Sequence, residues 1–331
     1  MTDWAKLHSE HFVGTRVLVT GGAGFIGSHL VEALLKLGAE VVAFDDLSTG
    51  NRENIEGLPR NGGRLAVVEA SILDQTALSK AIAGCRYVFH EAAMVEVPAS
   101  IERPDVCVDI NVVGTQRVLE AARQAGVERV MFAGSCAVYG NLPELPKREG
   151  LPTDAPNPYA ASKLAGEALM QAYASCYDLD TAALRYFNIF GPRQSATSAY
   201  AGVIAAFAKR SLAGQPITIH GDGRQSRDFT FVDNVVHANL LAARSRRPMG
   251  GRPINVGCAR QVSIGELATM MMQMFGQAHH QPTYGPPRDG DVVHSLADLS
   301  RARELLGYEP IVDFEAGLRD TVQWYRAAAG Q

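Results

Sequence analysis

The stretch that decides the fold is TGGAGFIG, residues 20–27, which lies between the apolar run RVLVT (16–20) and a segment with helical periodicity (26–37). Glycines at such a junction let the backbone turn tightly and approach a pyrophosphate, whose charge then lies at the helix N-terminus. The spacing is GxxGxxG and not GxGxxG, so the strand before the loop and the helix after it are the stronger evidence. The sequence predicts a dinucleotide-binding loop formed by Gly21, Gly24, Phe25, Ile26 and Gly27.

An acidic residue ends the next apolar run, VVAFD. Asp45 lies 18 residues after Gly27, where a carboxylate can bond the ribose hydroxyls of an adenosine. Because the same charge disfavours a 2′-phosphate, the sequence predicts NAD as the cofactor and not NADP.

Short apolar runs alternate with helical patterns through the first two-thirds of the chain. The runs fall at 16–20, 41–45, 64–69, 87–91, 130–135 and 181–187, and the helical patterns at 26–37, 77–83, 112–125 and 159–177. This alternation predicts an α/β fold, a Rossmann-type doubly wound parallel sheet. After about residue 190, Gly and Pro clusters separate shorter elements. We expect an NAD-binding domain over 14–190, with some later segments interleaved, and a smaller C-terminal α/β substrate-binding lobe over 191–331.

The composition argues against several classes of protein. The 331 residues carry a net charge of −4, whereas a general nucleic-acid binder usually has a basic surface. The five cysteines are scattered without a CxxC pair, which favours reduced thiols over disulfides or zinc. The first fifteen residues are rich in charge, and no apolar run approaches the roughly 20 residues of a membrane span. We expect a soluble cytoplasmic protein with no metal site and neither nucleic-acid nor membrane partners.

A second motif, PYAASK (158–163), places a tyrosine and a lysine on one helix face. Tyr159 and Lys163 are four residues apart, so their side chains project together. A free tyrosine titrates near ~10, and a neighbouring ammonium stabilises the phenolate and brings it toward the working range of a general base. Ser135 ends the buried run 130–135, in SCAVYG, where a hydroxyl needs a partner from the fold or from a ligand.

Together these stretches resemble the extended short-chain dehydrogenase/reductase family. TGGAGFIGS, the Ser135 and YxxxK set, RYFNIFGPRQ and SRDFTFVDN carry the match, which runs from about residue 16 to 325. Within the family the chain is most similar to UDP-hexose 4-epimerases, particularly those acting on N-acetylated sugars. The resemblance implies that Tyr159 removes the proton of the sugar 4-hydroxyl, that Lys163 lowers its pKa and bonds the nicotinamide ribose, and that Ser135 orients the hydroxyl.

The resemblance also implies a homodimer and further binding residues. For the cofactor it adds Ser71, Ile72 and Ala92, although Ser71 stands where relatives carry an Asp that contacts adenine. The expected contacts with the UDP-sugar substrate are Glu96, Ser135, Asn188, Gln194, Arg227, Arg288, Asp291 and Ser295. The resemblance places Ser295 beside the 2-substituent of the sugar, where a serine leaves room for an acetamido group. Glu96 stands where many relatives carry Ser.

Three alternatives remain open at this stage. Sugar dehydratases and decarboxylases of the family use an acidic residue just after the active-site serine, where this chain has Cys136 and Ala137, so both reactions are disfavoured. A UDP-glucuronate 4-epimerase is the main rival, and Glu96 argues against it through like-charge repulsion. A catalytically silent, NAD-sensing binding protein is the alternative from another class, because a fold does not guarantee activity.

Overall fold

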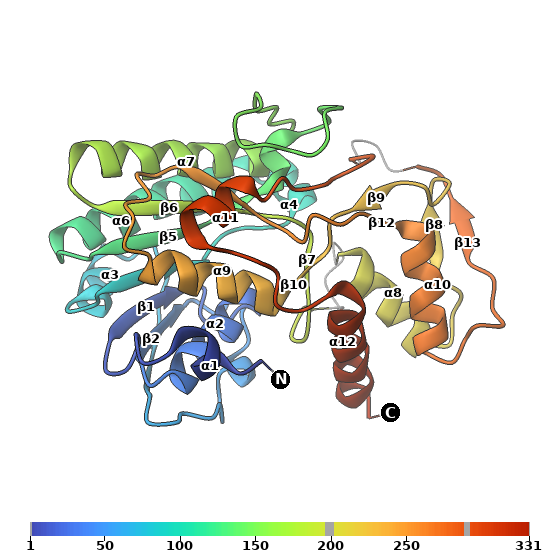
Figure 1. Ribbon diagram of the computed structural model, residues 1–331, viewed down its shortest axis with the longest axis horizontal. Helices are drawn as coiled ribbons and strands as arrows, with labels where there is room; N and C mark the ends of the chain where they lie inside the picture. Colours follow the sequence, from blue (N-terminus) through green and yellow to red (C-terminus); the bar gives the residue numbers. More distant parts are fainter. Residues whose placement is uncertain (1, 196–201, 288–291, 331) are drawn as a thin grey trace.

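A parallel sheet of seven strands runs through the centre of the molecule (Figure 1). The computed structural model describes residues 2–195, 202–287 and 292–330. Within them the sheet has the order β11-β6-β5-β4-β1-β2-β3, and each neighbouring pair is parallel. Its strands are β1 (Arg16–Thr20), β2 (Glu40–Asp45), β3 (Arg64–Glu69), β4 (Tyr87–His90), β5 (Arg129–Ser135), β6 (Asp180–Tyr186) and β11 (Pro253–Val256). The predicted Rossmann-type fold is confirmed.

The order of the strands reverses between β1 and β4. From β1 the chain continues to β2 and β3 on one side, and then returns to β4, β5 and β6 on the other. At such a switch point the connecting loops diverge and leave a crevice outside the carboxyl ends of the strands. The glycine loop follows β1 and therefore lies at this crevice.

Helices cover both faces of the sheet, because its strands are apolar on both sides. Val17 and Val19 of β1 belong to the core under one set of helices, whereas Leu18 between them belongs to the core under the other. The first set is α2 (Phe25–Lys36), α9 (Val232–Arg244) and α11 (Ser300–Leu306), with α1 (Trp4–His8) packed on α2. The second set is α3 (Gln75–Ile82), α6 (Thr115–Gln124) and α7 (Pro158–Cys176).

A smaller lobe with its own core lies beside the carboxyl edge of the sheet (Figure 1). Four phenylalanines, Phe190, Phe229, Phe231 and Phe314, pack edge-to-face or stacked at ring-centroid distances of 5.6–6.3 Å. The helices of the lobe are α8 (Val203–Leu212), α10 (Ile264–Met274) and α12 (Phe314–Ala328). Its described strands form three two-stranded sheets: β7 (Ile189–Phe190) with β10 (Thr230–Phe231), β9 (Ser226–Arg227) with β12 (Val262–Ser263), and β8 (Thr218–His220) with β13 (Thr283–Gly285).

Two elements differ from the sequence-based expectation. The expected helix over 112–125 is α6, preceded by α5 (Pro104–Val108) and a π-helical turn over Asp109–Gly114. The wider turn accommodates Asn111, whose amide bonds both backbone groups of Met94 and the Ser162 hydroxyl. The sheet also takes its seventh strand, β11, from beyond residue 190, and α9 packs against β5 and β6. The boundary drawn between 190 and 191 stays a prediction.

In the described part of the chain, no helix is both long and apolar enough to cross a membrane. Across the same residues, no three His, Cys, Asp or Glu side chains are grouped to hold a metal ion.

A buried ion pair fixes α7, the helix of the YxxxK motif, to strand β6. Arg185 donates two hydrogen bonds to Glu167, of 2.8 and 2.7 Å, and both side chains are nearly inaccessible, at 4% and 6%. The guanidinium also lies 4.8 Å from the centroid of the Tyr139 ring. Because a buried charge without its partner is strongly unfavourable, this pair holds α7 at one position along the sheet.

We predict that Glu167→Gln lowers the free energy of unfolding by about 3 kcal/mol or more, since it leaves a buried guanidinium without a counter-ion. Urea unfolding measures this change. Glu309→Gln is the matched control: it breaks a two-bonded pair with Arg303 at the surface, where we expect a loss below about 1 kcal/mol. Equal losses in the two variants would contradict the role given to the buried pair.

Candidate active site

A cavity of about 860 Å³ extends along the carboxyl edge of the sheet and into the small lobe. Most of the residues predicted for cofactor and substrate line it: Gly21, Gly24, Phe25, Ile26, Gly27, Asp45, Ser71, Ile72, Ala92, Ser135, Tyr159, Lys163, Asn188, Gln194, Arg227 and Ser295. Glu96 does not line this cavity; it is half-buried and precedes α4 (Val97–Glu102). Arg288 and Asp291 lie outside the described residues.

The glycine loop forms one end of the cavity, and its shape requires glycine. Gly21 has a φ of +66°, and a Cβ there would lie 2.7 Å from the backbone nitrogen of Ala92. A Cβ on Gly27 would overlap the Gly21 carbonyl, so the first turn of α2 can approach the loop only without a side chain. Gly24 directly precedes α2. The backbone is therefore open to a pyrophosphate at the N-terminus of α2, as a dinucleotide requires.

Asp45 ends β2 beside this loop and binds to the backbone around it. One carboxylate oxygen accepts from Ala23 N and the other from Leu47 N, both at 2.9 Å. Burial raises the pKa of this carboxyl, and the two backbone hydrogen bonds oppose the rise. The carboxylate thus orders the loops after β1 and β2 and keeps an acceptor and a negative charge at this end of the cavity.

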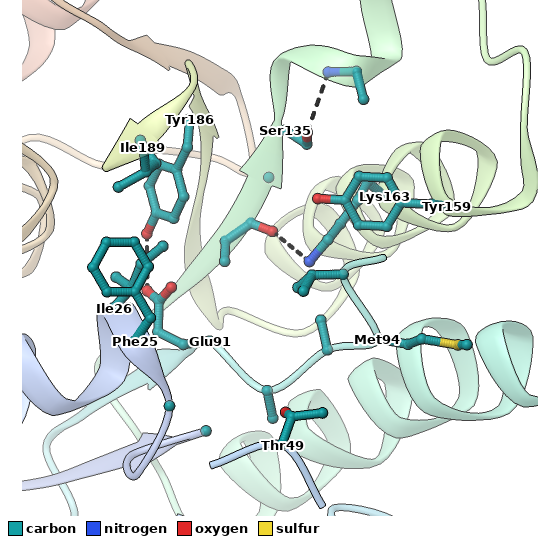
Figure 2. A pocket seen from close by; sticks show the side chains of 18 of the residues that line it. Phe25, Ile26, Thr49, Glu91, Met94, Ser135, Tyr159, Lys163, Tyr186 and Ile189 are labelled. Carbon is teal, nitrogen blue, oxygen red and sulfur yellow. Dashed lines mark hydrogen bonds between the residues drawn. The ribbon is translucent and has the colours of Figure 1, made fainter. Parts of the chain in front are cut away.

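Ser135, Tyr159 and Lys163 gather at the middle of the cavity (Figure 2). Ser135 ends β5, and its oxygen accepts from Ala137 N at 3.2 Å. Tyr159 lies in the first turn of α7, and Lys163 lies one turn further along. The Lys163 ammonium donates to the Ala133 carbonyl at 2.9 Å and lies 5.8 Å from the centroid of the Tyr159 ring. The carboxyl end of β5 thus holds both the serine and the lysine.

Burial dominates the ionisation of this group. It raises the pKa of Tyr159 to about 12, against the opposing effect of a hydrogen bond with Ser135. It also lowers the pKa of Lys163 to about 8, against the opposing charge of Glu91. The sequence led us to expect that Lys163 lowers the pKa of Tyr159; in this structure burial is the main influence on that pKa, Lys163 is not among the groups that shift it, and the ammonium bonds a carbonyl. An additional positive charge in the cavity would favour the phenolate.

On the lobe side, two of the predicted substrate residues contact each other. The Asn188 amide donates to the Ser295 hydroxyl at 3.0 Å, and Asp228 N donates to the same hydroxyl at 3.3 Å. Gln194 donates to the Ile189 carbonyl, while its buried Oε1 has no partner among the described residues. That oxygen is a buried acceptor whose hydrogen-bonding capacity is unused in this structure.

A second cavity, of about 560 Å³, adjoins the first. Asn188, Ile189, Gln194 and Arg227 line both. Beyond them the second cavity is bounded by apolar side chains such as Phe207 and Phe229 and by polar ones such as Thr218 and Gln225. Such a pocket, with apolar walls and a few polar groups, suits a flat heterocycle that needs orientation.

The sequence analysis missed several residues that line the first cavity, among them Glu91, Lys147 and Tyr186. The Tyr186 hydroxyl donates to Glu91 at 2.8 Å. A signal for Glu91 existed: it directly follows β4, at the same sheet edge as Asp45 and Ser135. Lys147 comes from an irregular loop, and no sequence pattern connects that loop to the cavity.

Known proteins share this architecture. The family described as the NAD dependent epimerase/dehydratase family matches residues 17–257. The UDP-glucose 4-epimerase of Mycolicibacterium smegmatis is 42% identical over 314 residues, which cover 94% of this chain and 98% of that protein. Other relatives are UDP-glucuronate 4-epimerases.

Solved structures agree with this relationship. The UDP-N-acetylglucosamine 4-epimerase from Methanobrevibacter ruminantium, in complex with UDP-N-acetylmuramic acid, has a TM-score of 0.90 and 36% identity, covering 96% of this chain and 100% of that one. The Thermus thermophilus UDP-glucose 4-epimerase in complex with NAD has a TM-score of 0.83 and 36% identity, covering 95% and 100%. The family match over 17–257 and these relatives show that the chain belongs to the NAD dependent epimerase/dehydratase family, with NAD as its cofactor.

Proposed function

We propose that the protein catalyses 4-epimerisation of a UDP-hexose, with UDP-GlcNAc and UDP-GalNAc as the preferred pair and UDP-Glc and UDP-Gal as further substrates. The observation that carries this proposal is that Ser135, Tyr159 and Lys163 line a cavity bounded at one end by the glycine loop and adjoining a second cavity at the other. This arrangement suits a dinucleotide and a nucleotide-sugar whose reactive ends meet at the tyrosine. Relatives named as UDP-sugar 4-epimerases support the same reaction.

The chemistry assigns one task to each of the three residues. Tyr159, as phenolate, removes the proton of the sugar 4-hydroxyl, and Ser135 bonds the 4-oxygen. Lys163, held by the Ala133 carbonyl, stabilises the phenolate through its charge. The glycine loop and Asp45 would hold NAD, which would supply reversible hydride transfer at carbon 4 and would not be consumed. Tyr159 returns the proton after the 4-keto sugar has turned about its pyrophosphate linkage and presents its other face.

The binding of the nucleotide-sugar rests on the lobe residues. Arg227 lines both cavities, where a guanidinium can make bidentate contacts with a pyrophosphate. Ser295 is small and 5% exposed, which leaves room for an acetamido group, and the polar side chain of Gln194 lines the same cavity. These features support the N-acetylated hexoses as substrates.

One observation favours a second candidate, a UDP-glucuronate 4-epimerase. Lys147 lines the first cavity together with Ser135 and Cys136, and it bonds the Leu142 carbonyl. Among the residues that the structure describes, no carboxylate lies within ion-pair distance of its ammonium. A uronate carboxylate would supply the missing charge. Because Glu96 does not line the cavity, its repulsion of a uronate weighs less than the sequence suggested.

The decisive experiment incubates the pure protein separately with UDP-GlcNAc, UDP-Glc and UDP-GlcA and resolves the products by chromatography. We expect UDP-GalNAc from the first substrate, and UDP-Gal at a lower rate from the second. Turnover of UDP-GlcA alone would replace the proposed substrate class by the second candidate. A lack of 4-epimer from all three would contradict the proposed reaction.

We predict that Tyr159→Phe lowers turnover by at least the roughly 10²–10⁴-fold typical of general acid–base catalysis. The lost hydroxyl acts mainly in the transition state, so binding of UDP, measured by calorimetry, should persist. Turnover close to that of the parent would refute the role given to Tyr159.

We predict that Ser295→Tyr blocks UDP-GlcNAc and UDP-GalNAc while sparing UDP-Glc and UDP-Gal, because the larger ring occupies the space for the acetamido group. Overpacking a filled site costs about 1–3 kcal/mol, which is about one to two decades in rate. The measurement is the ratio of kcat/KM for the two substrate pairs in parent and variant. Ser295→Ala is the control, since it removes the bond with Asn188 without filling the site. An unchanged ratio in Ser295→Tyr would mean that Ser295 does not face the sugar.

The homodimer and the cytoplasmic location remain predictions. Exposed apolar side chains support a dimer: Val108 ends α5, at 47% exposed, and Val113 lies in the following π-helical turn, at 36%. A second copy covering these side chains would remove them from water.

A further inference from the structure

Glu91 is an acidic side chain in the wall of the cavity that the proposed reaction does not use. It directly follows β4 at the carboxyl edge of the sheet. In Figure 2 its carboxyl group lies with Phe25 and Ile26 of the glycine loop to one side and Lys163 and Tyr159 across the cavity. A dinucleotide that reaches from the glycine loop to Tyr159 must pass this carboxyl group.

The hydrogen bonds behind Glu91 are directed so that it acts as an acceptor. The Asn239 Nδ2 atom bonds both the Val235 carbonyl, at 3.0 Å, and the Tyr186 hydroxyl, at 2.8 Å. Because a carbonyl can only accept, that Asn239 atom is the donating amide nitrogen. The Tyr186 hydroxyl therefore accepts from Asn239 and donates its own hydrogen to Glu91 Oε1 at 2.8 Å. This chain favours an ionised carboxylate.

The second oxygen of Glu91 is left for a ligand. In the residues that the structure describes, Glu91 Oε2 has no hydrogen-bond partner, and the residue is half-buried in the cavity wall. The titratable or charged groups that act on Glu91 are Tyr186 of β6 and Lys163 of α7. The neighbouring side chains from the other elements are uncharged: Phe25 and Ile26 of α2, and Asn239 of α9. Burial raises the pKa of Glu91 to about 7, against the effects of Tyr186 and Lys163.

We propose that Glu91 is an electrostatic partner of the nicotinamide ring, which makes the protein bind the cationic, oxidised form of the cofactor in preference to the neutral, reduced form. A carboxylate facing the cavity attracts a positive ring and gains nothing from a neutral one. An enzyme that begins each turnover with oxidised NAD benefits from this bias. If the keto sugar dissociates before the hydride returns, the cofactor stays reduced, and the protein holds this reduced cofactor less strongly. The inference rests on the NAD cofactor and not on the identity of the sugar.

The test measures the bound cofactor directly. The holoprotein is equilibrated with an excess of NAD⁺ and NADH in equal amounts and is passed through a desalting column. The retained nucleotides are released by denaturation and quantified. We expect the ratio of bound NAD⁺ to bound NADH to fall by about tenfold in Glu91→Gln, because the amide keeps the shape and the acceptor but loses the charge.

Two further variants make the result specific. Asp46→Asn removes a carboxylate from the same cavity at the end of β2. Because this position adjoins Asp45 at the adenosine end, it should leave the ratio unchanged within about twofold. Tyr186→Phe removes the donor to Glu91 and should shift the ratio in the same direction as Glu91→Gln, by less. If Glu91→Gln fails to fold, Tyr186→Phe still tests the proposal.

A pH series adds a readout that a purely structural role would not change. In the parent protein the ratio should be higher at about pH 8, where Glu91 is ionised, than at about pH 6, where it is protonated. In Glu91→Gln this difference should shrink, although Lys163 still titrates. A ratio that is equal in the parent and Glu91→Gln, or a parent ratio that does not rise with pH, would overturn the proposal, whichever sugar the enzyme accepts.

Discussion

Because the strands of the sheet are parallel, they bring their carboxyl ends to one edge, and the cavity follows that edge. β1 leads into the glycine loop, β2 ends at Asp45, β5 ends at Ser135 and β6 ends at Tyr186. Glu91 comes directly after β4. The functional groups are therefore far apart in the sequence but adjacent in the fold, and their spacing follows that of neighbouring strands, about 4.8 Å. The reversal of strand order between β1 and β4 opens the crevice in which a ligand can contact all of them.

This edge is also where the protein buries charge. Glu91 and Lys163 are each driven toward the neutral form by desolvation and toward the charged form by the other. The pKa of Glu91 is therefore raised to about 7, and the pKa of Lys163 is lowered to about 8. Shifts of this kind are typical of groups in active sites. The pair between Glu167 of α7 and Arg185 of β6 differs, because its two charges are joined by two hydrogen bonds. Glu91 and Lys163 both line the cavity, whereas the Glu167–Arg185 pair holds the helix in place.

The sequence allowed the sheet, and the grouping of Ser135, Tyr159 and Lys163 in one cavity, to be predicted because both depend on local patterns. TGGAGFIG and the YxxxK spacing are each contained within a few residues, and each strand or helix of the alternation is predicted from its own short segment. Strand β11 could not be assigned in this way, because PINV is short and its partner β6 lies far away in the sequence. The bond between Lys163 and the Ala133 carbonyl and the chain from Asn239 through Tyr186 to Glu91 depend on packing between elements. No local pattern records such contacts.

The late arrival of β11 affects how the chain folds during its synthesis. Six of the seven strands, and α7 with them, leave the ribosome before β11 does, so the N-terminal part can assemble while the outer edge of β6 still has unpaired backbone groups. α9, which packs against β5 and β6, also emerges only after the first part of the small lobe, from β7 to β10. A nascent chain that stalls before residue 253 would expose an apolar strand, Asp180–Tyr186, to other chains. The first part of the small lobe, from β7 to β10, is thus inserted between two parts of one folding unit, and its translation time adds to the time for which that edge stays open.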